Sequence, residues 1–131
     1  MVTSGQIARG IGAWVDAELL PMTTGATKYG ASVAAAMGAK WMEGKLEKIR
    51  NMETAKELGI AVGDGFDLEA LKTVMLERFP ADGLRIEAEQ LNKMIAKFLG
   101  KWGAILNIQL QGAVTFHRSD VEKLFGYIMG G

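Results

Sequence analysis

The sequence predicts an α+β fold that is mostly helical and carries a small antiparallel C-terminal sheet, a hairpin with or without a third strand. Apolar residues recur at helical spacing through much of residues 1–79. Residues 106–116 instead alternate apolar and polar side chains, as half-buried strands do. With 131 residues, 49% of them hydrophobic, the chain has the size of one ordinary domain. We therefore expect a single domain over residues 1–131, with a helical half in residues 1–58 and a helix, sheet and closing helix in residues 67–131.

The first helix is expected to begin at Ser4, a suitable N-cap, and to end before Pro21. Gly10 and Gly12 each lower its intrinsic stability by about 1 kcal/mol relative to Ala. The helix therefore needs packing against other elements. Its apolar residues stand at helical spacing: Ile7, Ile11, Trp14, Val15 and Leu19.

A second, longer helix is expected over residues 26–50, and it has two faces that can pack. One face carries small residues at every fourth position, Gly30, Ala34 and Gly38, which let another helix backbone approach closely. The partner helix lies either in the same chain or in a second subunit. The adjacent face carries large residues: Tyr29, Val33, Met37 and Trp41.

Two packable faces need more partners than one short neighbouring helix offers. The sequence therefore predicts a homo-oligomer with Gly30, Ala34, Gly38 and Trp14 in the interface. Charge is also uneven, since residues 51–90 carry four basic and nine acidic side chains. This acidic segment either favours head-to-tail association of copies or is simply a solvated face.

The middle of the chain is rich in caps and turns. A short helix from Glu53 to Leu58 is expected to stop at Gly59, followed by a loop over residues 60–65. Asp67 is expected to cap a fourth helix that ends at Pro80. The Asp-Gly pair in the loop does not match a calcium loop, because only Asp64 and Gly65 fit an EF-hand and three of its ligand positions hold apolar residues, Ile60, Val62 and Leu71.

Residues 84–102 allow either one long helix or a strand from Leu84 to Ala88 followed by a helix, and we favour the strand. Residues 106–110 and 114–116 are expected to pair as a hairpin that turns at Gln111 and Gly112.

Ser119 and Glu122 fit a capping box at the start of the last helix. We expect Phe116, Leu124 and Ile128 to be buried together in one core.

Three lysines at steps of four, Lys93, Lys97 and Lys101, form a basic patch with aromatic neighbours. Such a patch can contact nucleic acid or an anionic membrane surface. A solvated helix face opposite a buried apolar face is the simpler interpretation.

The sequence offers no catalytic, cofactor-binding or metal-binding constellation, and we expect the protein not to be an enzyme. It has no cysteine and one histidine, His117. Ser119 and Asp120 stand beside that histidine, but a catalytic triad is defined by spatial geometry rather than by contiguity. Asp16 and Glu18 point in different directions on a helix and make a poor acid–base pair.

Composition also argues against two classes of partner. The net charge of zero disfavours a general nucleic-acid binder. The longest apolar stretch, residues 31–39, is far shorter than the roughly 20 residues that span a bilayer. The first residues lack the layout of a secretion signal, so we expect an intracellular location.

Two stretches carry a resemblance, GDGFDLEALK at residues 63–72 and FHRSDVEKLFGYI at residues 116–128. Together they resemble small uncharacterised proteins encoded by phages and prophages of bacteria. The resemblance implies a non-enzymatic structural, assembly or accessory role, in which the chain binds itself or another phage protein. It also implies a location in the cytoplasm of the host cell or in the virion. Two alternatives remain open: a regulatory module that contacts nucleic acid through the basic patch, and a peripheral membrane protein that uses the first helix.

Overall fold

The computed structural model describes residues 1–130, apart from the side chains of Lys28 and Tyr29. The fold is α+β and mostly helical, as predicted, with small antiparallel strand pairs. The helices are α1 (Ser4–Trp14), η1 (Val15–Leu19), η2 (Leu20–Met22), α2 (Lys28–Arg50), α3 (Glu53–Glu57), α4 (Leu68–Arg78), α5 (Ala88–Leu99), α6 (Lys101–Leu106) and α7 (Arg118–Gly130). The strands are β1 (Thr23–Thr24), β2 (Ala61–Val62), β3 (Gly65–Phe66), β4 (Leu84–Ile86), β5 (Gln109–Leu110) and β6 (Val114–Phe116).

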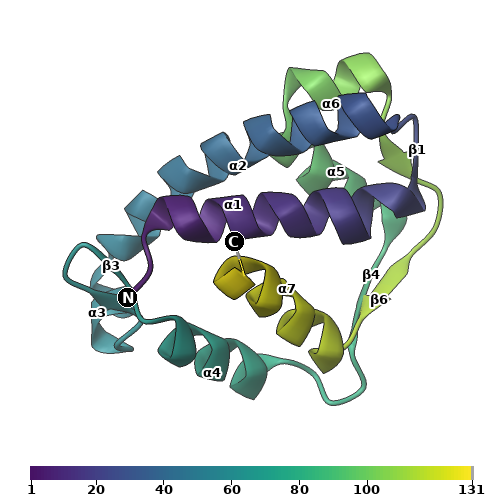
Figure 1. The fold of residues 1–131 in the computed structure, drawn as a ribbon. Helices are drawn as coiled ribbons and strands as arrows, with labels where there is room; N and C mark the ends of the chain where they lie inside the picture. The colour runs from purple at the N-terminus through teal and green to yellow at the C-terminus, as the bar shows by residue number, and fades with distance from the viewer. Residues whose placement is uncertain (131) are drawn as a thin grey trace.

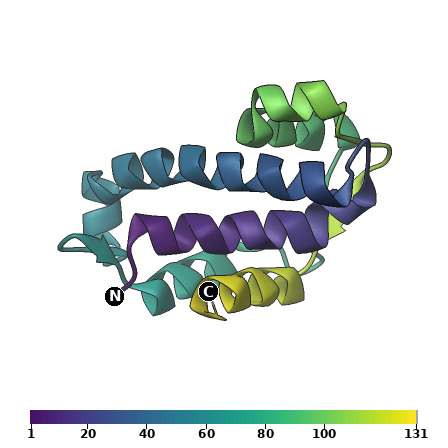
Figure 2. The same cartoon turned by 45° about the horizontal axis from the view of Figure 1, so that its top comes forward.

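The helices stack in layers around α1. α2 runs along one side of α1, and α7 and α4 lie on the other side (Figure 1). The turned view in Figure 2 shows α5 and α6 on the far side of α2, so that α2 separates them from α1. α1 is therefore the central helix of the molecule.

The N-cap of α1 is Thr3, one residue earlier than predicted. The Thr3 hydroxyl accepts a hydrogen bond from the backbone N–H of Gln6 at 3.1 Å. The Gln6 side chain in turn accepts one from the Thr3 N–H at 2.8 Å, which completes a capping box. Ser4 is instead the first helical residue and is buried, because the chain enters the helix beneath the β2–β3 hairpin, where Val2 pairs with Phe66.

The helix that begins at Ser4 continues beyond Trp14 as one turn of π-helix, η1. A π-turn holds more residues per turn than an α-helix and is frequent at functional sites. Val15 and Leu19 of this turn are buried, and so is Leu20, which follows it in η2. Pro21 then lies within η2, and the helical run ends at Met22, slightly later than predicted.

The small residues of α2 pack against helices of the same chain. A Cβ at Gly38 would lie 2.6 Å from the carbonyl oxygen of Phe98 in α5, and one at Gly30 would lie 3.0 Å from the Leu106 side chain in α6. Ala34 between them is completely buried. The sequence left open whether these small residues pack against a helix of the same chain or of a second subunit. The structure shows the packing within the chain.

The middle segment largely follows the prediction. The Asp67 carboxylate accepts a hydrogen bond from the Ala70 N–H and caps α4. Gly59 has a φ of +72°, as expected of a glycine that ends a helix. Residues 60–65 are not a plain loop, because Ala61 and Val62 pair with Phe66 and Gly65 as a short hairpin.

Residues 84–102 form a strand followed by a helix, which confirms the favoured alternative, although α5 already begins at Ala88. The predicted hairpin between residues 106–110 and 114–116 is wrong. β6 pairs with β4, and β5 pairs with β1. Leu110 lies opposite Thr23 of β1, and its backbone N–H and C=O also bond to the Asn92 side chain of α5, at 2.6 and 3.0 Å, instead of to a hairpin partner in β6.

The cap of α7 also differs from the prediction. Asp120, and not Glu122, accepts a hydrogen bond from the chain before the helix, from the His117 N–H at 2.7 Å. The predicted common core is divided as well. Ile128 and Leu124 belong to a cluster beneath α1, whereas Phe116 is only half-buried and packs at the edge of a second cluster.

The two main hydrophobic clusters share α1. One lies around Leu20, Ala34 and Leu99, between η1, α2 and α5. The other lies around Ile7, Phe66 and Phe125, between α1, β3 and α7. Ile11 and Met42 contact both clusters.

Substituting Gly38 tests this packing. We expect Gly38→Ala to lower the free energy of unfolding by about 1–3 kcal/mol, because the new methyl group meets backbone atoms of α5 that cannot move alone. Gly44 in the same helix is the matched control, since a methyl group there would have nothing within 4 Å. Gly44→Ala should raise the stability by about 0.5–1 kcal/mol in urea denaturation. Equal stabilities for the two variants would contradict the proposed contact.

Candidate functional site

A large apolar cleft lies between the two halves of the molecule. Its volume is about 470 Å³, within the range of natural ligand pockets. The α1–η1 run contributes Trp14, Val15 and Leu19, and the side formed by α2 and α5 contributes Trp41, Met42, Leu91, Met94, Ile95 and Phe98. The other side consists of Met75, Phe79, Leu84, Ile86, Phe116, Val121 and Leu124, from α4, β4, β6 and α7.

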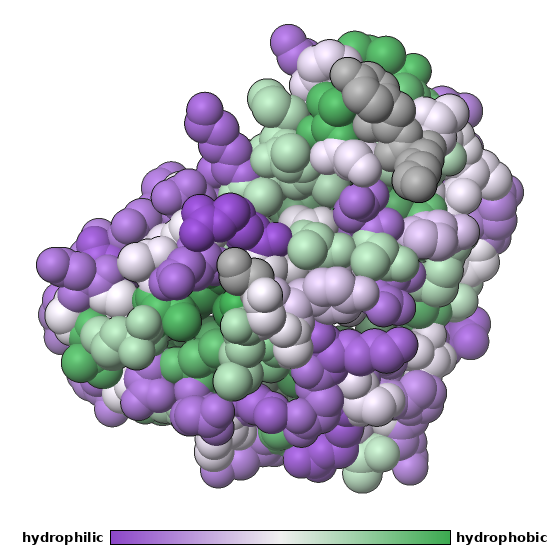
Figure 3. Space-filling view, viewed as in Figure 1, coloured by the Kyte–Doolittle hydropathy of each residue, from purple (hydrophilic) through white to green (hydrophobic). Residues whose placement is uncertain are grey.

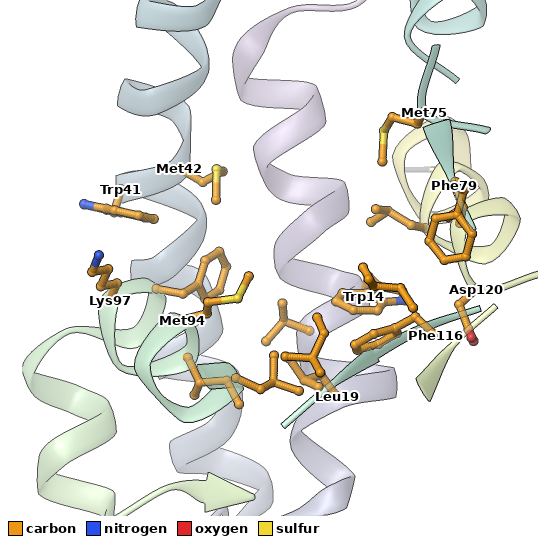
Figure 4. A pocket seen from close by; sticks show the side chains of 18 residues that line it. Trp14, Leu19, Trp41, Met42, Met75, Phe79, Met94, Lys97, Phe116 and Asp120 are labelled. Atoms are coloured by element: carbon orange, nitrogen blue, oxygen red, sulfur yellow. The ribbon is translucent and has the colours of Figure 1, made fainter. Parts of the chain in front are cut away.

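An aromatic contact connects α1 to one side of the cleft. The ring centroids of Trp14 and Phe116 lie 6.0 Å apart and the rings are tilted by 46°. Figure 4 shows both rings between the α2–α5 side and the α4–α7 side. This contact joins α1 to the β4–β6 pair.

Large apolar side chains surround the mouth of the cleft. Met94 is 58% exposed, Leu84 41% and Trp41 40%, although each of them lines the cavity. Three of the eight methionines of the chain, Met42, Met75 and Met94, lie here. Methionine is flexible and polarisable, and it is favoured on surfaces that adapt to apolar partners.

Two charged residues line the cleft, Lys97 and Asp120, and Figure 4 shows them on opposite sides. Lys97 lies beside Trp41, whose ring also has the Lys45 ammonium 5.3 Å from its centroid. Asp120 lies beyond Phe116, and one of its oxygens accepts the hydrogen bond from His117. The two charged residues of the lining therefore stand on opposite walls of the cleft.

Polar contacts hold α7, which forms part of one wall. The Tyr127 hydroxyl donates a hydrogen bond to Glu18 of η1 at 3.0 Å, and the Lys123 ammonium lies 3.6 Å from the same carboxylate. Lys72 of α4 forms an ion pair with Glu122 at 2.6 Å. The hydrogen bond to Glu122 raises the pKa of Lys72, and the one to Glu18 raises the pKa of Tyr127.

The predicted self-association residues have different surroundings. Gly38 packs against α5 and Gly30 against Leu106 of α6 in the same chain, and Ala34 between them is completely buried. Trp14 lies in the cleft instead. The four residues therefore do not form one surface.

The predicted basic patch is not continuous. Lys93 pairs with Glu89 at 3.6 Å, and Lys97 lies at the cleft. Lys101 belongs to α6, because the chain breaks at Gly100, whose φ is +59°. The change of helix direction separates Lys101 from the other two.

Residues 1–130 hold no group of three or more acidic or histidine side chains that is placed to bind a metal ion, and His117 is exposed. In the same part of the chain no helix is long and apolar enough to cross a membrane. A second hollow, of about 370 Å³, lies between η1 and α2, where the Ser32 hydroxyl donates a hydrogen bond to Asp16 at 3.2 Å.

Apolar surface is not confined to the cleft. On the face shown in Figure 3, apolar side chains gather over α6, whose Ile105 is 68% exposed, and between α1 and α4. The cleft is larger than the hollow between η1 and α2, and its lining is almost entirely apolar. This combination of depth and apolar lining makes it the candidate binding site.

No family model, curated protein or solved structure matches the chain.

The titration of Tyr127 tests the contact that holds α7. We expect Glu18→Ala to lower the pKa of Tyr127, followed through its ¹³Cζ chemical shift, because the hydrogen bond that favours the protonated phenol is lost. Since the folded-state pKa is the higher one, the contact stabilises the fold at neutral pH and is lost as the pH rises through that pKa. Glu122→Ala, on the same helix, should leave the Tyr127 pKa unchanged. An unchanged pKa in Glu18→Ala would contradict the contact.

Proposed function

We propose that the protein is not an enzyme and acts by binding an apolar segment of another protein chain in the cleft. The observation that carries this proposal is the 470 Å³ cavity, which opens to solvent between Trp41, Leu84 and Met94. Large apolar side chains gathered at an open hollow are costly to leave in water, and such surfaces mark interaction sites.

The composition of the mouth favours a protein over a small molecule. Trp, Phe and Met are enriched at the centres of protein interfaces, where a few large anchors supply most of the affinity. Trp41 and Met94 line the cavity and yet are 40% and 58% exposed. A partner chain would cover these residues and fill the hollow, whereas a small ligand in the hollow would leave them exposed.

The partner is another phage-type protein or a second copy of this chain, within the structural, assembly or accessory role that the resemblance implies. A binding protein of this kind needs no catalytic or cofactor residues. Self-association remains part of the proposal only through the cleft, because the small-residue stripe of α2 is occupied by α5 and α6.

Photo-crosslinking from the mouth of the cleft tests the proposal. Benzoylphenylalanine in place of Met94 should yield adducts with one defined polypeptide in an extract of the cell that makes the protein, identified by mass spectrometry. The same probe in place of Met129, which is 64% exposed and lies outside the cleft, is the control. We expect at least a tenfold excess of adduct at position 94.

Equal adduct formation at the two positions, or the absence of any polypeptide adduct at position 94, would contradict protein binding in the cleft. An adduct with the mass of two copies of the chain would identify the partner as the protein itself, and sedimentation should then show an oligomer.

A further inference from the structure

We propose that α4 belongs to a strap, residues 67–83, that opens and closes over one wall of the cleft. In the open state the strap swings away from α7, while α1, α2, α5 and α7 stay folded. The inference goes beyond the proposed function, because it describes the free protein and holds whichever partner the cleft binds.

α4 is apolar but poorly buried. Every residue of this eleven-residue helix is at least partly exposed to solvent, whereas α1, of the same length, has six buried residues. The partly exposed residues of α4 include Leu71, Val74, Met75 and Leu76. Segments with few buried apolar contacts open at a lower free energy than the core of a protein. α4 is therefore suited to open while the core helices stay in place.

The apolar side chains of α4 are divided between two clusters. Met75 and Leu76 pack against the cluster that contains Phe125, whereas Val74 packs against a smaller cluster at α3 and β2. On the face shown in Figure 3, apolar side chains remain visible between α1 and α4. α4 therefore covers the core incompletely, and its release exposes less additional apolar surface than the release of a buried helix would.

Both ends of the strap are anchored by strands. Phe66, directly before the strap, exchanges two backbone hydrogen bonds with Val2, of 2.7 and 3.0 Å. β4, directly after the strap, pairs with β6 over all three of its residues. Gly83, the last residue of the strap, has a φ of +91°, which glycine adopts without strain. Figure 1 shows α4 at the edge of the molecule beside α7, so the strap can swing outward about two fixed points.

An ion pair holds the closed position. The Lys72 ammonium of α4 lies 2.6 Å from a carboxylate oxygen of Glu122 in α7. Both side chains are partly exposed, and exposed ion pairs contribute little to stability. This contact therefore favours the closed position without locking the strap in place.

Opening the strap changes the cleft. Met75 and Phe79 of the strap line the cleft, and Figure 4 shows both on the α4–α7 side. Val121 of α7 lines the cleft as well, is 7% exposed and belongs to the cluster against which Met75 packs. When the strap swings outward, Val121 becomes accessible and the cleft widens. The strap therefore controls access to this wall.

Hydrogen exchange distinguishes opening of the strap from global unfolding. The amides of Met75 and Leu76 should exchange at least about tenfold faster than those of Gly10 and Gly12 in α1, after correction for intrinsic rates. Gly44→Ala in α2, where a methyl group has nothing within 4 Å, stabilises the open and closed forms alike against the unfolded chain. It should slow the exchange of Gly10 and Gly12 about two- to fivefold and leave that of Met75 and Leu76 unchanged.

Breaking the ion pair provides the second arm. Lys72→Glu should speed the exchange of Met75 and Leu76 about threefold, in line with the modest energy of an exposed ion pair. The charge swap Lys72→Glu/Glu122→Lys should restore most of the protection. Because the chain has no cysteine, Val121→Cys introduces a single thiol. Its reaction with a bulky maleimide should also become about threefold faster when Lys72→Glu is added.

Three outcomes would overturn the inference. If Gly44→Ala slows exchange in α4 as much as in α1, α4 opens only with the whole fold. If Lys72→Glu leaves exchange in α4 unchanged, the ion pair does not hold the strap closed. If exchange becomes faster but labelling of Val121→Cys does not, α4 frays without uncovering the wall of the cleft. None of these outcomes bears on protein binding, which the crosslinking from position 94 tests.

Discussion

The rest of the structure depends on the close approach of α1 to the helices on its two sides. A Cβ at Gly10 would lie 2.5 Å from the Cα of Ile128 in α7, and a Cβ at Gly12 would lie 2.9 Å from the Cβ of Ala39 in α2. Neither position accepts a larger side chain without moving a neighbouring helix. The two glycines weaken α1 as an isolated helix, yet they let α2 and α7 pack against it, and tertiary contacts offset the loss.

The cleft is a consequence of this arrangement. α1 contacts α2 on one side and α7 on the other, so both hydrophobic clusters form along this one helix. The cleft lies between the elements that carry the two clusters. Each wall is fixed by a contact of its own. On one wall α5 packs against Gly38 of α2, and on the other the hydrogen bond between Tyr127 and Glu18 holds α7 to η1. A collapsed cleft would bury Trp41 and Met94, but these contacts keep the helices that carry them in place. The apolar surface left open is what makes a binding function the best-supported interpretation.

The sequence predicted the local elements better than their partners. The N-cap at Asp67 and the stop at Gly59 depend on residues close in the chain, and both appear as expected. The strand at residues 84–86 was also predicted, but its pairing with β6 was not, because alternation does not specify the neighbour. β1 has only two residues and no apolar–polar alternation. The sequence therefore contains no sign that β5 pairs with β1 instead of forming a hairpin with β6. The cleft was missed for the same reason, since its lining runs from Trp14 to Leu124 and becomes one surface only when distant elements pack.

The most direct test of this close approach is the effect of Gly10→Ala on stability and on the methyl signals of the cleft methionines, with Gly126→Ala as the control. Nothing lies within 4 Å of a methyl group at Gly126, which is on the exposed side of α7. We expect Gly10→Ala to be less stable by about 1–3 kcal/mol and to shift the methyl signal of Met75 or Met42, because α7 has to move away from α1. The control should leave these signals in place. A Gly10→Ala variant as stable as the parent, with unshifted cleft signals, would contradict the claim that this close approach shapes the cleft.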